Sequence, residues 1–403
     1  MSKLPSVSIL VFFLATQANL YGQDCESIPT ILDQGRLIQF PDTSNYKTIV
    51  LDPHTHSVFS DGYVWPCIRV EEALRDGLDA LAITEHLEWQ LHLADIPHPD
   101  RNRSYEVAVG ASEESELIVI AGVEVTREVP HGHINALFIS DANKMFANFT
   151  PEDPKDIDGY YDTTGEWPAQ NAVDAANAQG AFLFWNHSWW DEEIPSFIPQ
   201  AGEFQITNAK NNLLHGIEIV NTNSYSKEAF QIALDLQLTL MGSSDVHELI
   251  DWDYDVAEGG HRPVTLVLAA ERSGESIREA LFEGRTVVWF KNTLFGYEPH
   301  MAELLQSSLT VSSSYYAGKL DVLVLEVENH SDSDFQLKNM SGYSFFGTTD
   351  TIAIPQHQIT QIGVKTGTRI EKVSLEFEVQ NALVKPGKYA TIVLSSDEID
   401  IRE

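Results

Sequence analysis

A short apolar run that ends in a cluster of polar side chains sets the strongest limit on how this chain can fold. Residues 48–51 (TIVL) are rich in β-branched side chains and are followed closely by Asp52, His54, His56 and Asp61. This pattern predicts a buried strand that delivers polar groups at its C-terminal end. Because alternate residues of a strand point the same way, His54 and His56 project from one face and could hold one metal ion.

The same pattern recurs further along the chain. Further strands are predicted at residues 78–84, 117–121, 134–139, 181–185, 217–220, 238–241, 264–269 and 286–290. Helices are predicted at residues 66–76, 168–179, 227–236 and 275–283. The looser segment 143–167, rich in Asp, Pro and Gly, is predicted to be a surface insertion.

The alternation of strands with helices predicts a parallel α/β arrangement. At least six of these strands carry metal-competent residues just beyond their C-terminal ends. A closed α/β barrel gathers its active site from many such loops, whereas an open sheet gathers ligands at only one or two switch points. The sequence therefore predicts a barrel.

The candidate metal ligands share a position at the end of a predicted strand, and His133 directly precedes one. They are His54, His56, Asp61, His86, Glu124, His133, His187, Asp245 and His247. Imidazoles with a few carboxylates suit zinc, manganese or iron better than calcium, which prefers oxygen alone. The set is too large for one ion, so we expect two or three divalent ions, with Glu124 able to bridge two of them.

These motifs, taken in order, resemble those of the PHP (polymerase and histidinol phosphatase) superfamily. The residues that carry the resemblance are Asp52-Pro-His54-Thr-His56, Ser60-Asp61-Gly62, Ile83-Thr84-Glu85-His86, Gly122-Val-Glu124, Gly132-His133, Asn186-His187 and Ser244-Asp245-Val-His247. The resemblance covers residues 48–292. It implies a distorted (β/α)7 barrel, a trinuclear metal site and phosphoesterase chemistry.

The resemblance also implies three ligand groups. The first is His54, His56, Glu124 and Asp245; the second is Glu124, His133 and His187; the third is Asp61, His86 and His247. Asp61 stands where some members of the superfamily have histidine. A hydroxide between two ions would be available near neutral pH to attack phosphorus, because the cations lower the pKa of bound water.

Five residues, Asp245 among them, are candidates for roles in catalysis or substrate binding. Glu124 and Asp245 are the predicted catalytic carboxylates, and His131 or His261 could protonate the leaving group. His131 could instead replace His133 as a ligand. Arg262 could clamp a phosphate, or could form a structural ion pair in this acidic protein.

Tryptophans occur on or near the same loops. They are Trp65, Trp89, Trp189, Trp190 and Trp252. Such rings could stack on an organic or sugar moiety at the rim of a site, or could pack between loops.

The pattern changes at about residue 309. From there to residue 403, alternating apolar and polar residues between turn signals predict a β-sandwich. We therefore expect a barrel domain at residues 23–300 and a sandwich at residues 309–403.

The first residues have the layout of a secretory signal. Lys3 precedes the apolar segment 7–15, and small and polar residues follow up to residue 22. We expect residues 1–22 to be a signal peptide and the protein to be exported, to the periplasm or outside the cell, without stable insertion in the membrane. A disulfide between Cys25 and Cys67 is possible in such a compartment, and Cys67 could otherwise pack as a small buried residue.

The net charge narrows the choice of partner. Sixty acidic residues against 25 lysines and arginines give a formal charge of −35, which disfavours binding to nucleic acid. The sequence favours a metal-dependent phosphoesterase that acts on small organic phosphate esters. The alternatives are a metal-dependent hydrolase of a carboxylic ester, carbamate or amide, and a non-catalytic secreted protein that is stabilised by metal. The oligomeric state is not indicated.

Overall fold

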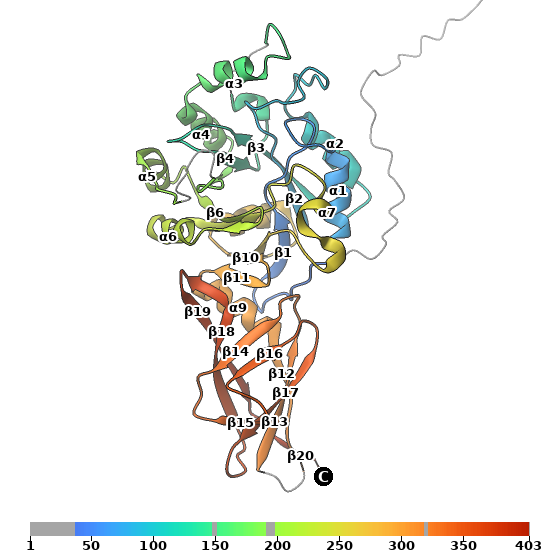
Figure 1. The fold of residues 1–403 in the computed structure, drawn as a ribbon, viewed down its shortest axis with the longest axis vertical. Helices are drawn as coiled ribbons and strands as arrows, with labels where there is room; N and C mark the ends of the chain where they lie inside the picture. The colour runs from blue at the N-terminus through green and yellow to red at the C-terminus, as the bar shows by residue number, and fades with distance from the viewer. Residues whose placement is uncertain (1–36, 147–150, 191–197, 318–320, 403) are drawn as a thin grey trace, which may run out of the picture.

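The protein consists of an α/β barrel and a C-terminal β-sandwich that extends from one end of it (Figure 1). The computed structural model describes residues 37–146, 151–190, 198–317 and 321–402. The predicted signal peptide and Cys25 lie outside these residues. Cys67 is buried and disulfide-bonded. Within the described residues, no helix has both the length and the apolar character that a membrane crossing requires.

The barrel contains two sets of parallel strands. One set is β1 (Lys47–Asp52), β2 (Ala80–Ile83) and β3 (Ile118–Val125). The other set is β5 (Phe182–Trp185), β6 (Gly216–Asn221) and β8 (Thr239–Ser243), and the short strand β7 (Ser224–Tyr225) pairs with β6.

Antiparallel strands complete the barrel. Strand β4 (Ile134–Leu137) joins β3 to β5, while β9 (Val264–Ala269) pairs with β1 and β10 (Thr286–Phe290) pairs with β9. The predicted barrel is confirmed, but its sheet is mixed rather than following the predicted parallel arrangement throughout. Residues 126–133 are too few for a helical crossover, so β4 has to run back along β3.

The barrel closes where β8 lies against β9 and β10, through side chains rather than a continuous ladder. Thr265 Oγ1 donates to Gly242 O at 2.8 Å and accepts from Gly242 N at 2.9 Å. Thr286 Oγ1 donates to Leu240 O at 2.8 Å. A Cβ at Gly242 would lie 2.2 Å from Val288 Cγ1, so only glycine allows this approach.

Helices cover the outside of the barrel. They are α1 (Pro66–Arg75), α2 (Arg103–Ser112), α4 (Ala169–Ala178), α5 (Glu203–Lys210), α6 (Lys227–Leu236) and α8 (Gly274–Phe282). Their starts follow familiar rules: proline opens α1, and Ser226 and Ser273 cap α6 and α8. Short helices lie in the loops: α7 (Ile250–Tyr254), η1 (Ala142–Lys144) and η2 (Val256–Glu258).

The segment predicted to be a surface insertion contains a helix. Helix α3 (Ile157–Gly165) begins after Asp156, whose side chain accepts a hydrogen bond from Gly159 N at 3.0 Å. The Asp and Gly residues that suggested a loop therefore act at the start of this helix. Residues 147–150, in the same segment, lie outside the described part of the chain.

The two domains share one sheet and one core. Strand β11 (Thr293–Gly296) pairs with β10 and also with the sandwich strand β18 (Val373–Lys385), and α9 (Glu298–Ser308) follows it. Leu294 and Leu304 from this junction join the same hydrophobic cluster as Leu337 and Val379 of the sandwich. The sandwich is therefore packed onto the barrel rather than linked to it by a free segment.

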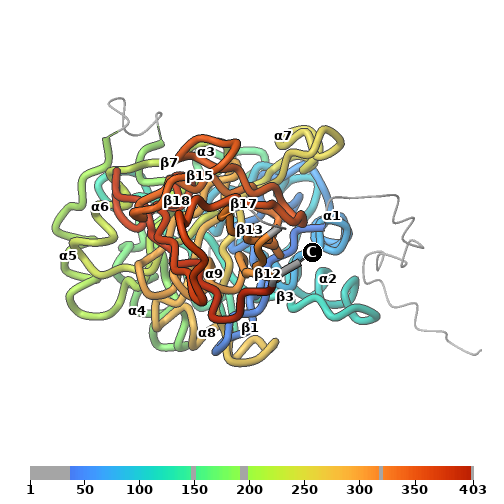
Figure 2. The backbone as a smooth tube through the Cα atoms, turned by 90° about the horizontal axis from the view of Figure 1, so that it is seen from below, coloured from blue at the N-terminus to red at the C-terminus, as the bar shows by residue number. Residues whose placement is uncertain are grey.

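The C-terminal domain is the predicted β-sandwich (Figure 2, viewed from the sandwich end). One sheet contains β12 (Leu309–Ala317), β13 (Val322–Asn329), β15 (Ser344–Phe346), β17 (Ile359–Lys365) and β20 (Asp400–Arg402). The other contains β14 (Phe335–Asn339), β16 (Thr351–Ile354), β18 and β19 (Lys388–Ser396). Alternate residues Leu323, Leu325 and Val327 of β13 are buried, as expected for a strand with one face in the core.

Candidate metal centre

The loop after β1 is folded back so that its polar side chains converge. Thr55 forms an isolated β-bridge with Val246, and its hydroxyl donates to Ala82 O at 2.7 Å. The turn that returns Asp61 toward His56 requires glycine at position 62, where a Cβ would lie 2.7 Å from Ser57 N. The backbone contacts thus place His54, His56 and Asp61 above the barrel.

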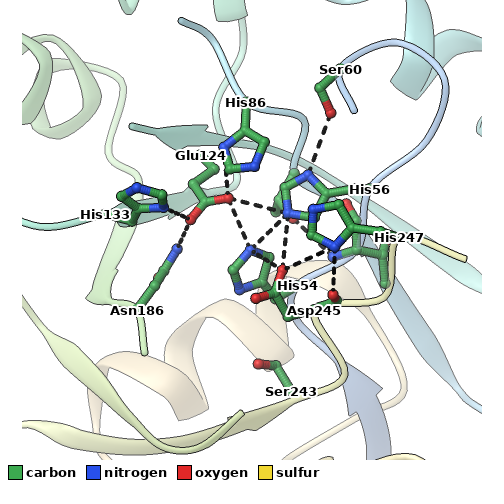
Figure 3. A network of polar contacts seen from close by, with 12 residues as sticks. His54, His56, Ser60, His86, Glu124, His133, Asn186, Ser243, Asp245 and His247 are labelled. Atoms are coloured by element: carbon green, nitrogen blue, oxygen red, sulfur yellow. Dashed lines mark hydrogen bonds and ion pairs between the residues drawn. The ribbon is translucent and has the colours of Figure 1, made fainter. Parts of the chain in front are cut away.

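Four side chains, of which only Asp245 is partly exposed, bring their donor atoms to one point (Figure 3). His54 Nε2 lies 3.0 Å from His56 Nε2. Each of these nitrogens lies 3.1 Å from Glu124 Oε2 and 3.1 Å from Asp245 Oδ1. A metal about 2.1 Å from four tetrahedral ligands would hold those ligand atoms about 3.4 Å apart, so the spacing is close to that of a metal site.

Two further groups adjoin the first. His56, Asp61, His86 and His247 form one, and His86, Glu124 and His133 form the other. His247 Nε2 lies 3.2 Å from Asp61 Oδ1, and His133 Nδ1 lies 2.9 Å from Glu124 Oε1. His187 Nε2 is less close, at 3.4 Å from Glu124 Oε1 and 3.9 Å from Asp245 Oδ2. All nine predicted ligands therefore meet in one cluster, with Glu124 at its centre.

The polar atoms of the cluster are satisfied better by a bound cation than by one another. Glu218 Oε1 lies 2.9 Å from His54 Nδ1, and the carboxylate can only accept, so Nδ1 carries the proton. In the neutral ring, His54 Nε2 then points a lone pair at the carboxylates of Glu124 and Asp245. Three acceptors facing one another in a buried space require a positive charge between them, so the residues present fit a divalent ion.

The cluster forms part of the wall of a cavity of about 960 Å³. The described residues that line it include no lysine or arginine, and its other walls are rich in aromatic rings. The lining residues used below are Trp89, Thr126, Glu128, Tyr161, Trp189 and Trp190. The donor atoms therefore face a space large enough for a small organic molecule.

A similar solved structure decides the family. It is a two-domain protein from Bacteroides vulgatus that contains a predicted PHP-like metal-dependent phosphoesterase. It is 34% identical to this chain with a TM-score of 0.78, and the match covers 90% of this chain and 99% of that one. This chain belongs to the PHP superfamily.

Other comparisons add little about function. An amidohydrolase from Chromobacterium violaceum is 18% identical, with a TM-score of 0.35 over 49% of this chain and 87% of that one. A lesion-specific endonuclease from Pyrococcus furiosus is 13% identical, with a TM-score of 0.38 over 66% of this chain and 62% of that one. Both are too distant to support an inference. A family model described as an Ig-like domain matches residues 309–395, and no curated protein matches the chain.

The charges in this PHP centre perturb its histidines in opposite directions. Burial lowers the pKa of His56, but hydrogen bonds with Asp245 and Glu124 outweigh it and raise the pKa to about 10. At His86 burial prevails over the nearby carboxylates and lowers the pKa to about 3. Burial would raise the pKa of Asp245, yet His54 and the other imidazoles hold it below its usual range. The field of the carboxylates thus attracts positive charge to the side of the cluster near His56.

Two buried carboxylates support the PHP ligands, and the sequence alone assigned neither of them this role. The first, Glu218 on β6, accepts hydrogen bonds from four groups. They are His54 Nδ1 (2.9 Å), Ser243 Oγ (2.5 Å), His187 N (2.7 Å) and Asn221 Nδ2 (2.9 Å). The signal in the sequence was an acidic residue in the middle of an apolar strand, where a charge is costly unless it has partners.

The second is Glu85, directly before His86. It accepts hydrogen bonds from Ser57 N at 3.0 Å and Ser60 Oγ at 2.6 Å, and also from the Ser57 hydroxyl. Ser60 Oγ lies 3.4 Å from His56 Nδ1, so Glu85 orients His56 through this hydroxyl.

Arg262 is not at the cavity. Its side chain is fully buried, with Nη2 2.7 Å from Asp76 Oδ2 and Nη1 3.1 Å from Asp52 Oδ2. The predicted phosphate clamp is therefore wrong, and the alternative, a structural ion pair, is what the structure shows. Asp52 in turn accepts from Ser244 N at 3.1 Å, which ties this pair to the loop that carries Asp245.

The two predicted proton donors also lie apart from the cluster. The His261 ring stacks on Trp289 with centroids 3.5 Å apart and lines a second cavity, which shares no lining residue with the first. The His131 ring packs edge-on against Phe204 at 4.8 Å and does not line the metal cavity. The predicted roles of His261 and His131 in protonating the leaving group, and of His131 as a ligand in place of His133, are therefore not supported by their positions.

Proposed function

We propose that this protein hydrolyses small organic phosphate esters with two or three divalent metal ions, manganese, zinc or iron. The observation that carries this proposal is the convergence of His54 Nε2 and His56 Nε2, 3.0 Å apart, on the carboxylates of Glu124 and Asp245. Membership of the PHP superfamily also supports the proposal, since the similar protein from Bacteroides vulgatus contains a predicted PHP-like metal-dependent phosphoesterase.

Each residue would act by holding or orienting. His54, His56, Glu124 and Asp245 would hold the first ion, Glu124, His133 and His187 the second, and Asp61, His86 and His247 the third. Bound ions would supply water of lowered pKa and positive charge for the phosphoryl oxygens. Glu218 keeps the proton on His54 Nδ1, so that Nε2 remains available as a ligand atom.

A second candidate is favoured because none of the described residues that line the cavity is a lysine or arginine. Arg127 is 6% exposed and pairs with Glu88, and Arg262 is buried with Asp52 and Asp76. Neither reaches the cavity, so any phosphoryl group would depend on metal ions alone for its positive partners. A carboxylic ester, carbamate or amide would not need such partners, and hydrolysis of one of these bonds is the alternative.

The test is hydrolysis of a chromogenic phosphate monoester, a phosphodiester and a carboxylic ester by the purified protein. Each is measured with manganese, with zinc and with chelator, and His187→Ala is compared with the matched variant His330→Ala in the sandwich. We expect metal-dependent hydrolysis of a phosphate ester that His187→Ala abolishes and His330→Ala preserves. Metal-dependent turnover of the carboxylic ester alone would move the assignment to the alternative.

We also propose that the protein is exported, on the basis of the signal-like residues 1–22. Detection of the intact and processed chains in cell fractions of a producing bacterium tests this. An unprocessed chain in the cytoplasm would contradict it.

A further inference from the structure

Aromatic rings form the part of the cavity that adjoins the metal centre. The Trp190 ring packs against His133 and His187, with centroid distances of 5.7 and 5.6 Å. Trp89 and Tyr161 meet edge to face across the cavity wall, with centroids 5.8 Å apart and planes at 87°. A group bonded to a phosphoryl oxygen at the metal centre would therefore lie beside aromatic faces.

Hydrogen bonds fix the ring of Trp189 and the backbone of the loops that carry Trp190 and Trp89. Trp189 Nε1 donates to Ser224 Oγ at 2.9 Å, and Trp190 N donates to His187 O at 2.9 Å. The loop that carries Trp89 is fixed by Gln90, whose amide donates to His86 O. Because the backbone of these loops is already fixed, stacking on the rings does not require the loops to become ordered, which lowers the entropic cost of binding.

Away from the metal centre, the charge of the cavity wall disfavours a second anionic group on the substrate. Among the described lining residues there is no lysine or arginine, and Glu128 contributes a carboxylate beside Thr126. The neighbouring Arg127 donates to Thr126 O at 2.8 Å and pairs with the buried Glu88, so it is turned away. A further phosphate or carboxylate on the substrate would meet negative charge with no partner.

We propose that the substrate is a phosphate monoester whose leaving alcohol carries an uncharged aromatic or heteroaromatic ring and no second anionic group. Trp89 and Trp190 determine this specificity by stacking on the ring. The inference rests on the proposed function, because it concerns the leaving group at the same site.

The experiment compares esters whose alcohols have similar acidity, so that differences report binding rather than leaving-group chemistry. They are benzyl phosphate, cyclohexylmethyl phosphate and 4-carboxybenzyl phosphate, assayed with the manganese-loaded full chain. Stacking on one aromatic side chain corresponds to about a 2- to 10-fold preference. We expect kcat/KM for benzyl phosphate to exceed that for cyclohexylmethyl phosphate by at least the lower value of this range. We expect 4-carboxybenzyl phosphate to be the poorest substrate of the three.

The variants Trp89→Ala and Trp190→Ala should each remove most of the preference for the planar ring. The matched control is Trp252→Ala, because Trp252 is 69% exposed and is not among the lining residues. Equal kcat/KM for the benzyl and cyclohexyl esters, or a preference that survives in both cavity variants, would overturn the proposal.

A second measurement separates this proposal from the proposed function. Calorimetry records the binding of benzylphosphonate and cyclohexylmethylphosphonate, which cannot be hydrolysed at the C–P bond by this chemistry. Tighter binding of the benzyl compound, lost in Trp190→Ala, would support the aromatic subsite even if no ester were turned over. Hydrolysis of all three esters at similar rates, with no difference between the phosphonates, would leave the phosphoesterase in place and refute the subsite.

Discussion

Replacing Glu218 by glutamine should weaken the metal centre without changing the shape of the side chain. Glu218 is fully buried, and each of its two oxygens accepts two hydrogen bonds. A glutamine has one acceptor oxygen and one NH2 group. In either orientation of the amide, its NH2 group faces two other donors. These are His54 Nδ1 and Ser243 Oγ in one orientation, and His187 N and Asn221 Nδ2 in the other.

The magnitude follows from these contacts. A hydrogen bond to a charged group contributes about 1.5–3 kcal/mol, and the Ser243 hydroxyl can turn away at little cost. We therefore expect Glu218→Gln to lower the free energy of unfolding of the metal-free protein by about 2–4 kcal/mol. Loss of a carboxylate that orients a histidine ligand typically costs 10–100-fold in metal affinity, and we expect a loss in this range.

The assay is a competition titration of manganese or zinc against a chelator at pH 7.5, with urea unfolding of the metal-free protein in parallel. The control is Glu271→Gln, a change at an exposed turn position. If Glu218→Gln bound metal as tightly as the natural chain, the assignment of the His54 proton to Nδ1 by Glu218 would be refuted. If only stability changed, Glu218 would be a structural residue of the barrel.

Three further predictions concern the metal centre, the ion pair of Arg262 and the effect of acidic pH on stability. Asp245→Ala and His187→Ala should each weaken the metal affinity by at least about 10-fold in the same titration, while the circular dichroism spectrum stays unchanged. Unchanged metal affinity in both variants would contradict the ligand assignment. Arg262→Met removes the only cationic partner that the structure shows for the buried Asp52 among the described residues and leaves Asp76 paired with Arg75 alone, so it should cost about 3–5 kcal/mol in urea unfolding; a raised KM with normal stability would instead restore the phosphate clamp. Burial lowers the pKa of His98 and of His215 to about 4, so the unfolded chain binds protons first as the pH falls from 6.5 to 4. Stability in chelator should therefore decrease over that interval, by up to roughly 3 kcal/mol for each histidine, and His215→Gln should remove part of the slope; a flat profile would count against neutral buried rings.

The sequence was most informative where a local pattern is tied to one structure. The run 227–236 was predicted as a helix and is α6 (Lys227–Leu236), because a serine cap and an amphipathic repeat act within the segment itself. Strands β9 and β10 were also located correctly, since short apolar runs between turns have few alternatives in a barrel. The candidate ligands were identified because most of them follow such a strand, while His133 directly precedes β4 and Glu124 lies near the end of β3.

The direction of the strands could not be predicted from the sequence, as the antiparallel strand β4 shows. Periodicity indicates which residues are buried but not which neighbour a strand pairs with. The junction was missed for a related reason: β11 is defined by pairing with β18, which lies far along the chain. Helix α3 was missed because its Asp and Gly residues are as common in loops as at the starts of helices.

For the candidate site, the sequence by itself determined which side chains can bind metal, since histidine and carboxylate ligands are fixed by residue type and by their position at the ends of strands. Only the tertiary structure decided what the remaining charged residues do. Arg262 lies close in sequence to the metal motif at Asp245, yet its guanidinium is buried between Asp52 and Asp76. Glu218 appears in sequence as one acid in an apolar strand, yet it holds His54 in the orientation a metal requires. The physical reason is that the role of a buried charge depends on the partners that compensate for it, and these partners come from distant parts of the chain that only the fold brings together.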